Sequence, residues 1–235
     1  MRFKNLVLIG TSHIASQSLK EVEEGIEREK PGIIALELDK RRFLSLMSAE
    51  KKRPGIGLIR TIGITGYLFS LIGGWLQEKL GKYAGVSPGS EMRKAIMLAA
   101  EKKIDVVLID QDIVITMRRL SRMFSWRQKL RLGIDLLKGI FFRKKVMKEL
   151  GFDIDLTKVP EKRIIKKVMD MMRKSYPNLY KVLVEERNGV MAGNLAALMK
   201  NHPDKKILAI VGAGHEESIM RRIRKDFSEK EIDKI

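Results

Sequence analysis

Residues 6–13 read LVLIGTSH, a run of aliphatic, partly β-branched residues that stops at Gly10 and is followed by His13. The same pattern returns at residues 207–215, which read ILAIVGAGH. Apolar runs of this length are typical of strands covered on both faces in a parallel sheet, and the glycine lets the chain turn sharply where each strand ends. Open α/β sheets bind their ligands beyond the carboxyl ends of the strands. If the two strands are neighbours, His13 and His215 both lie at that edge.

Two more buried strands are predicted between these turns. Residues 16–30 carry apolar side chains at helical spacing, and residues 33–38, IIALEL, form the next apolar run, which completes a right-handed β-α-β unit. Residues 104–110, IDVVLID, form the third strand of this kind. Glu37 falls at the end of its strand and is therefore expected beside His13. The fold class expected is α/β, with a central, mostly parallel β-sheet flanked by helices and a large helical insertion.

Composition narrows the classes of protein and of site. The 235 residues are 44% hydrophobic, enough to bury the core of one α/β domain, and we expect a single domain over residues 1–235. The chain has no cysteine, which excludes disulfides, a thiolate nucleophile and a sulfur-ligated metal. Richness in Lys and Glu favours a thermophilic source.

Positive charge is concentrated in one part of the chain. The net charge is +18, and residues 118–148 carry eleven Lys or Arg against the single acid Asp135. They lie within a region, residues 113–175, that the pattern predicts to be helical and basic. Such a surface suits nucleic acid, an anionic lipid surface or an acidic partner. Nucleic acid is the weakest of the three, because no nucleic-acid-binding motif accompanies the charge.

A glycine-rich apolar segment at residues 55–80 interrupts the α/β pattern. It is expected to be helical, and it has no charged residue between Thr61 and Gln77. Arg60 and Glu78 close the uncharged run on either side, so it is short for a membrane-spanning helix. Three interpretations stay open: a hairpin or helix packed on the domain or on a second subunit, a membrane-surface or re-entrant element, and a true span. The second-subunit variant implies a homodimer.

The paired histidines and the strand-end acid suggest two kinds of site. Two neutral imidazoles can ligate a divalent metal if a third ligand joins them, and Glu37 is the carboxylate best placed to do so. Alternatively, Glu37 and a histidine could activate water without a metal, as a general base. The plain structural alternative is a pair of hydrogen-bonded histidines, with Glu37 paired to Arg41 or Arg42.

Other polar residues have an ordinary structural interpretation beside a functional one. Glu91 follows a helix-starting serine and suits the first turn of a helix. Asp110 and Asp112 could cap the next helix or pair with Arg118. The Glu186-Arg187 pair has the spacing of an ordinary solvated helix face.

Six segments taken together resemble the TraB/PrgY family. They are GTSH (10–13), PGIIALELDKRR (31–42), PGSEM (88–92), LIDQDI (108–113) with Thr116 and the Arg118-Arg119 pair, EERNGVMA (185–192) and VGAGHEESI (211–219). The family is similar to the Tiki metallopeptidases, marked by two GxxH motifs and an acid, and more distantly to erythromycin-esterase and ChaN-like proteins. The resemblance implies that His13, Glu37 and His215 form the core of the site. Glu91, Arg118 and Arg187 match positions that the family pattern repeats.

The function expected is that of a metal-dependent hydrolase, most simply a peptidase acting on a peptide or protein. His13, Glu37 and His215 would hold manganese, cobalt or zinc, while Glu37 or Glu91 takes a proton and Arg118 or Arg187 steadies an oxyanion. The alternative is a non-catalytic, membrane-associated regulator that binds or sequesters a peptide signal. PrgY-type members of the family resemble regulators of this kind.

The resemblance also implies a location. Archaeal members usually carry C-terminal membrane helices, so this domain is expected to be the soluble part of a membrane-attached protein. The basic surface favours the cytoplasmic side of that membrane.

Overall fold

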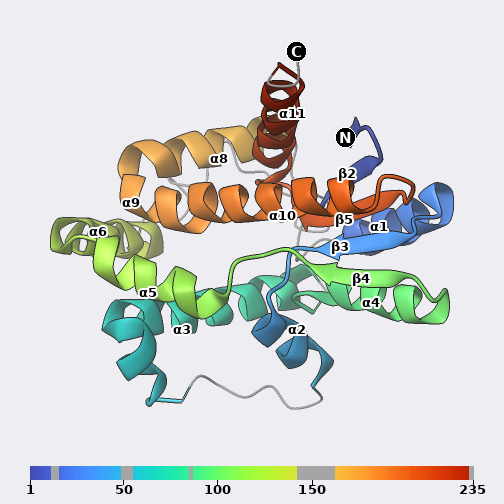
Figure 1. Cartoon of the computed structure of the whole chain (residues 1–235). Coiled ribbons are helices and arrows are strands. Elements are labelled where there is room, and N and C mark those ends of the chain that lie inside the picture. The colour runs from blue at the N-terminus through green and yellow to red at the C-terminus, as the bar shows by residue number, and fades with distance from the viewer. Residues whose placement is uncertain (12–15, 49–54, 85–86, 142–161, 233–235) are drawn as a thin grey trace.

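The computed structural model describes residues 1–11, 16–48, 55–84, 87–141 and 162–232. Within them, the strands form one sheet in the order β1-β2-β5-β3-β4 (Figure 1). The strand bounds are β1 Arg2–Phe3, β2 Leu6–Thr11, β3 Ile33–Leu36, β4 Asp105–Leu108 and β5 Ile207–Gly212. β1 is antiparallel to β2, and the pairs β2–β5, β5–β3 and β3–β4 are all parallel. The prediction of an α/β fold with a mostly parallel sheet is confirmed.

The two glycine-terminated strands are direct neighbours in this sheet. Thr11 at the end of β2 lies opposite Gly212 at the end of β5, and Leu36 at the end of β3 lies opposite Ile210. The carboxyl ends of the central strands are therefore brought to one edge. His13 itself lies outside the described residues.

Helices cover both faces of the sheet and extend beyond its carboxyl edge (Figure 1). Their bounds are α1 Ser16–Glu29, α2 Lys40–Met47, α3 Leu58–Ala84, α4 Ser90–Glu101, α5 Ile113–Met123, α6 Trp126–Phe141, α8 Lys162–Ser175, α9 Pro177–Tyr180, the π-helix η1 Lys181–Glu186, α10 Arg187–Asn201 and α11 Glu216–Ile232.

Alternating residues of each central strand enter two different cores. In β3, Ile33 and Ala35 pack with α10 and α11, whereas Ile34 and Leu36 pack with α1 and α4. Successive side chains of a strand point to opposite faces, so a strand covered on both sides has no polar position to alternate. This is the physical reason for the uninterrupted apolar runs in the sequence.

The helical insertion has a core of its own. Ile62 of α3, Leu120 of α5, Phe124 directly after α5 and Val182 of η1 are buried together there. α3 is interrupted at Gly63, whose φ of 75° lies in the left-handed region that favours glycine. Residues 142–161 of the predicted basic helical region lie outside the described residues.

The apolar segment is therefore a kinked helix packed on α5. The first 18 residues of α3, Leu58–Trp75, are long and apolar enough to cross a membrane, and only 11% of this stretch is buried. In the part of the chain that the structure describes, α3 alone passes this test.

The helical stretch from Pro177 to Asn201 is not α-helical throughout. A π-helical turn, η1, separates α9 from α10 over Lys181–Glu186. π-turns insert an extra residue into a helix and are frequent at functional sites. No residue pattern in 177–201 marks this turn, and Arg187 follows it directly.

Candidate functional site

A network of buried ions lies at the carboxyl edge of the sheet. Glu37 follows β3 directly, and its backbone N–H donates to the Ile210 carbonyl of β5 at 3.1 Å, so the ladder fixes its position. Its side chain is 2% exposed. Carboxylate oxygen Oε2 accepts the Gly212 backbone N–H at 2.6 Å, and Oε1 accepts from Arg187 Nη2. The prediction that Glu37 lies at this edge is confirmed.

Arg187 joins two buried carboxylates. Its Nε and Nη2 donate to the two carboxylate oxygens of Asp110 at 3.0 and 2.7 Å, while Nη2 also donates to Glu37. Nη1 donates to the Leu183 carbonyl in η1 at 3.2 Å. Burial of the guanidinium acts to lower the pKa of Arg187, but the charges and hydrogen bonds of Glu37 and Asp110 outweigh it and raise that pKa. Arg187 therefore stays protonated, and the interpretation of a solvated helix face is wrong for it.

A second arginine balances the charges of this network. Arg42 Nη1 contacts Asp110 Oδ2 at 3.2 Å, so two guanidinium groups face the two carboxylates. Arg41 contacts Asp112 instead, at 3.4 Å. Glu37 thus pairs with Arg187, a partner that the structural alternative of pairing with Arg41 or Arg42 did not include. Buried carboxylates are tolerated where they are paired and hydrogen-bonded in this way.

His215 faces the network from the start of α11. It lies between the end of β5 and Glu216, the first residue of α11. The predicted position of His215 beyond the carboxyl end of its strand is confirmed. Nδ1 is 2.6 Å from Asn188 Oδ1, and Nε2 is 3.5 Å from both Glu37 Oε1 and Arg187 Nη1. Because an amide oxygen only accepts, this contact is a hydrogen bond when Nδ1 carries a proton, and Nε2 is then the ring nitrogen that faces Glu37 and Arg187.

The remaining predicted site residues, His13, Glu91 and Arg118, are not among the residues described in the ion network. His13 lies outside the described residues, so the paired-histidine prediction stays a prediction. Glu91 is buried in the first turn of α4, as expected for a helix-starting acid. Arg118 is exposed on α5, and its Nε donates to the Thr61 carbonyl of α3 at 3.0 Å. The described contact of Arg118 thus joins two helices, and its catalytic role stays a prediction.

Three residues of the network were not among the predicted site residues. Asp110 had been interpreted as a helix cap or a partner of Arg118, but Asp112 does the capping through the Val114 N–H. The available signal for Asp110 was its place directly after a buried strand, as for Glu37. Arg42 and Asn188 gave no signal of their own, because their partners are distant in sequence.

The described donors match part of a metal site. Two ligands about 2.1 Å from one tetrahedral metal lie roughly 3.4 Å apart, close to the 3.5 Å between His215 Nε2 and Glu37 Oε1. The Nδ1 contact to Asn188 is the outer-shell partner that ligating histidines generally have. Arg187 competes, because it donates to the same Glu37 oxygen. No three His, Asp or Glu residues within the described ranges form a metal-binding group, and His13 is not among those residues.

Comparison with known proteins gives a consistent family match. A sequence model of the TraB/PrgY/gumN family matches residues 3–225. An uncharacterized protein of Methanocaldococcus jannaschii is 37% identical over 97% of the chain. The TraB domain-containing proteins of Homo sapiens and Bos taurus are each 23% identical over 96% of it. The chain spans 56% of the archaeal relative and 64% of each mammalian one.

Proposed function

The chain belongs to the TraB/PrgY/gumN family, and on that premise we propose that it is a hydrolase of peptide bonds that depends on a divalent metal. The ligands we assign are His13, Glu37 and His215, and manganese, cobalt or zinc suits such an imidazole and carboxylate set. Arg187 and Glu91 complete the site. This assignment rests on the carboxyl edge of the sheet, where Glu37, Arg187 and His215 meet.

The orientation of His215 is the observation that carries the proposal. Its Nδ1 lies 2.6 Å from Asn188 Oδ1, so Nε2 is the ring nitrogen that faces Glu37 Oε1. With Nδ1 held by Asn188, an unprotonated Nε2 would serve as a metal ligand or a general base.

The chain's own residues divide the chemistry between them. Glu37 or Glu91 accepts the proton of the attacking water, both being buried carboxylates. Nη1 of Arg187, 3.5 Å from His215 Nε2, is a fixed donor beside the point where the oxygen of a scissile carbonyl gains charge. A bound divalent ion would lower the pKa of the water and polarise that carbonyl.

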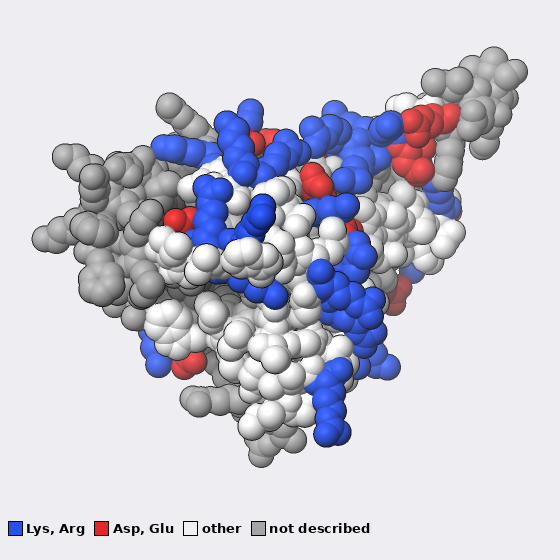
Figure 2. Space-filling view, turned by 90° about the vertical axis from the view of Figure 1, so that its left-hand side faces the viewer, with Lys and Arg blue, Asp and Glu red and all other residues white. Residues whose placement is uncertain are grey.

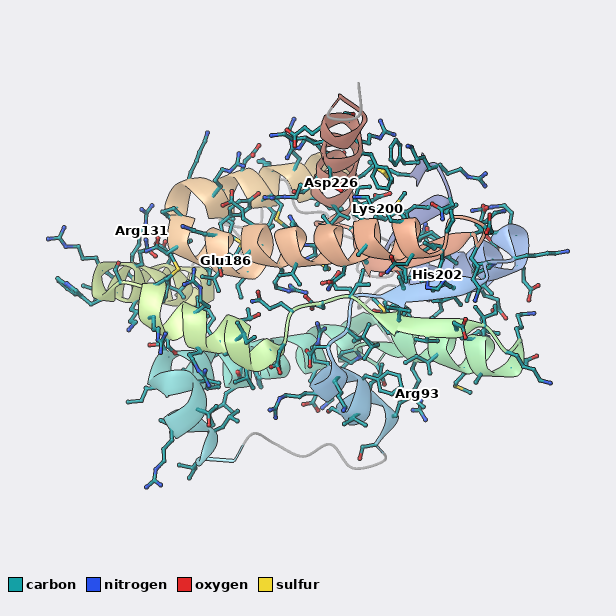
Figure 3. All side chains as sticks on the ribbon, viewed as in Figure 1. Arg93, Arg131, Glu186, Lys200, His202 and Asp226 are labelled. Atoms are coloured by element: carbon teal, nitrogen blue, oxygen red, sulfur yellow. The ribbon has the colours of Figure 1, made fainter. Side chains whose placement is uncertain are left out.

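Metal binding is the first test of the proposal. We would measure thermal unfolding with manganese, cobalt and zinc added in turn, for the wild type, His215→Ala and His202→Ala. His202 follows α10 in a turn remote from the network, which makes it a matched control (Figure 3). A stabilising shift in the wild type and His202→Ala that is absent in His215→Ala is expected. Equal shifts in all three proteins would contradict the assignment.

Hydrolysis is the second test. A mixed peptide library should release new amino termini in the presence of the stabilising metal and none after chelation. Hydrolysis that survives chelation would instead support a metal-free Glu37 and His215 pair. Peptide binding without turnover, unchanged in His215→Ala, would contradict the hydrolase and favour a regulator that sequesters a peptide.

A further inference from the structure

Two helices of the insertion expose apolar stripes. On α3 the exposed apolar side chains recur at intervals of one, three and four residues, and on α6 at four. They are Ile64, Leu68, Leu71, Ile72 and Trp75 on α3, and Trp126, Leu130 and Ile134 on α6. A hollow of about 400 Å³ follows the α6 stripe. Contiguous exposed apolar surface of this kind marks an interaction site more often than scattered residues do.

Helices α3 and α6 meet the same end of α5. The Phe69 ring of α3 meets the Phe124 ring edge-on, with 5.3 Å between centroids. Phe124 caps the end of α5 and lies two residues before the start of α6. The Gly66 N–H of α3 also donates to Ser121 Oγ of α5 at 2.7 Å. α3 and α6 therefore flank the end of α5, and we call their exposed side chains the α3/α6 face.

Both tryptophans of the chain are on this face. Trp75 is 59% and Trp126 is 68% exposed. Tryptophan has a large apolar body and one polar N–H, so a mostly solvated tryptophan is unusual in a protein surrounded only by water. The same amphipathic ring is enriched where proteins meet the interface of a bilayer.

The surroundings of the α3/α6 face are strongly basic. Residues 118–135 carry six Lys or Arg against the single acid Asp135. Figure 2 shows this side of the molecule, with basic side chains across its upper part and along one edge, around surface that is neither acidic nor basic. The basic side chains around the α3/α6 face thus complement a negatively charged surface. The apolar stripes carry no charge and need an apolar partner.

We propose that the α3/α6 face docks on the surface of a bilayer that contains anionic lipid. Apolar stripes with tryptophan between basic residues are the composition of helices that lie in a membrane interface. Lying on the surface also suits α3 better than crossing, because Gly63 breaks the helix and its inner face packs on α5. The proposal concerns a surface and does not depend on the hydrolase activity.

Docking this way would bring the candidate site close to the membrane. The carboxyl ends of the parallel strands point toward α5 and the helical insertion (Figure 1). Arg119 of α5 also pairs with Glu186, next to Arg187, at 2.6 Å. This last step alone rests on the proposed hydrolase: for such an enzyme, the arrangement would favour a peptide at or near the bilayer surface as the substrate.

The test uses the whole 235-residue chain and vesicles of phosphatidylcholine with or without phosphatidylglycerol. Sedimentation with phosphatidylglycerol vesicles, with a blue shift of tryptophan emission, is expected, and both should be absent with phosphatidylcholine alone. Binding should fade at about 0.5 M salt, where screening leaves little attraction across more than ~4 Å. No sedimentation with phosphatidylglycerol vesicles would overturn the proposal, including the case in which a stable dimer of the chain covers the face.

A matched pair of variants locates the contact. Leu68→Glu with Leu130→Glu, one in each stripe, should weaken vesicle binding by about a hundredfold, roughly tenfold for each apolar side chain lost. Leu44→Glu with Met97→Glu makes the same change at equally exposed leucine and methionine positions on α2 and α4 and should leave binding unchanged. Equal weakening by both pairs would overturn the assignment to this face.

A second pair of variants tests how much the basic residues contribute to vesicle binding. Arg127→Gln with Lys129→Gln should weaken binding about 25-fold, near fivefold for each charge. Arg93→Gln with Lys103→Gln removes two charges at the other end of the molecule, where Figure 3 labels Arg93, and should have little effect. These four positions are exposed, so the variants test the proposal even if the glutamate variants fail to fold. Equal loss in both pairs would show a response to net charge alone and would overturn docking through this face.

Discussion

Proteins usually bury apolar side chains and expose charged ones. The carboxyl edge of the sheet and the α3/α6 face depart from this rule in opposite ways. At the edge, Glu37 and Asp110 are carboxylates with side chains 2% exposed, held by Arg187 and Arg42. On the α3/α6 face, tryptophan and leucine side chains are in water among solvated arginines. Charged residues are seldom buried, and large apolar patches are seldom exposed.

Different interactions stabilise the two regions: buried ion pairs at the edge of the sheet, and an apolar core beneath the α3/α6 face. The edge depends on a closed set of ion pairs, in which the loss of one partner leaves a buried charge. The α3/α6 face depends on none of its exposed side chains for folding, since its stability comes from the core beneath it. A residue at the edge should therefore matter to stability, and a residue on the face mainly to binding.

The largest effect expected is from removing Arg187. Arg187→Ala leaves Glu37 and Asp110 without their shared partner and should lower the free energy of unfolding by about 3–5 kcal/mol. The control is Arg119→Ala, which breaks the more exposed pair with Glu186 and should lower stability far less, because solvent screens that pair. Urea unfolding measures both, and a similar small loss in each would show that burial does not distinguish the two pairs.

Packing under the α3/α6 face can be tested within one helix. A Cβ at Gly66 would lie 2.6 Å from the Met117 carbonyl oxygen, so Gly66→Ala should destabilise the protein by about 1–3 kcal/mol. Nothing lies within 4 Å of a Cβ at Gly73, and Gly73→Ala should stabilise α3 by up to about 1 kcal/mol. If both substitutions stabilise in thermal unfolding, the described packing of α3 on α5 is wrong.

The smallest effect expected concerns a carboxylate near the opposite end of the sheet. Glu29 is contacted by Arg28, Arg2 and Lys206. The hydrogen bond from Arg28, with that from Arg2, lowers the pKa of Glu29 despite burial. A lowered folded-state pKa stabilises the protein above the unfolded pKa of about 4.3, and this contribution disappears as the pH falls through the folded value.

Urea midpoints measured from pH 7 down to about pH 3 test this sign. Glu29→Gln should lower stability at pH 7 and should lose less than the wild type on acidification. A parallel pH dependence in the two proteins would contradict the pKa shift of Glu29.

The sequence predicted those parts of the site that local patterns determine. β2, β3 and β5 are uninterrupted apolar runs, so their ends could be located, and with them Glu37 and His215. The prediction that both turns lie at one edge required β2 and β5 to be neighbours in the sheet. The order of the strands confirms that they are.

The ion network could not be predicted, because it depends on long-range geometry. Asp110 and Arg187 are 77 residues apart and meet only through the order of the sheet and the π-turn before α10. Neither feature has a local signature. The exposure of the α3/α6 face was equally inaccessible, since an apolar stripe in a sequence is the same whether it is covered or solvated.

The most direct test of the proposed site is the protonation of the His215 ring. A long-range ¹H–¹⁵N spectrum of the histidine side chains at neutral pH, with His215→Ala to assign the signals, reports which nitrogen carries the proton. We predict a neutral ring protonated at Nδ1, with an Nε2 resonance that shifts when zinc is added. A proton on Nε2, with no response of that nitrogen to zinc, manganese or cobalt, would contradict the account.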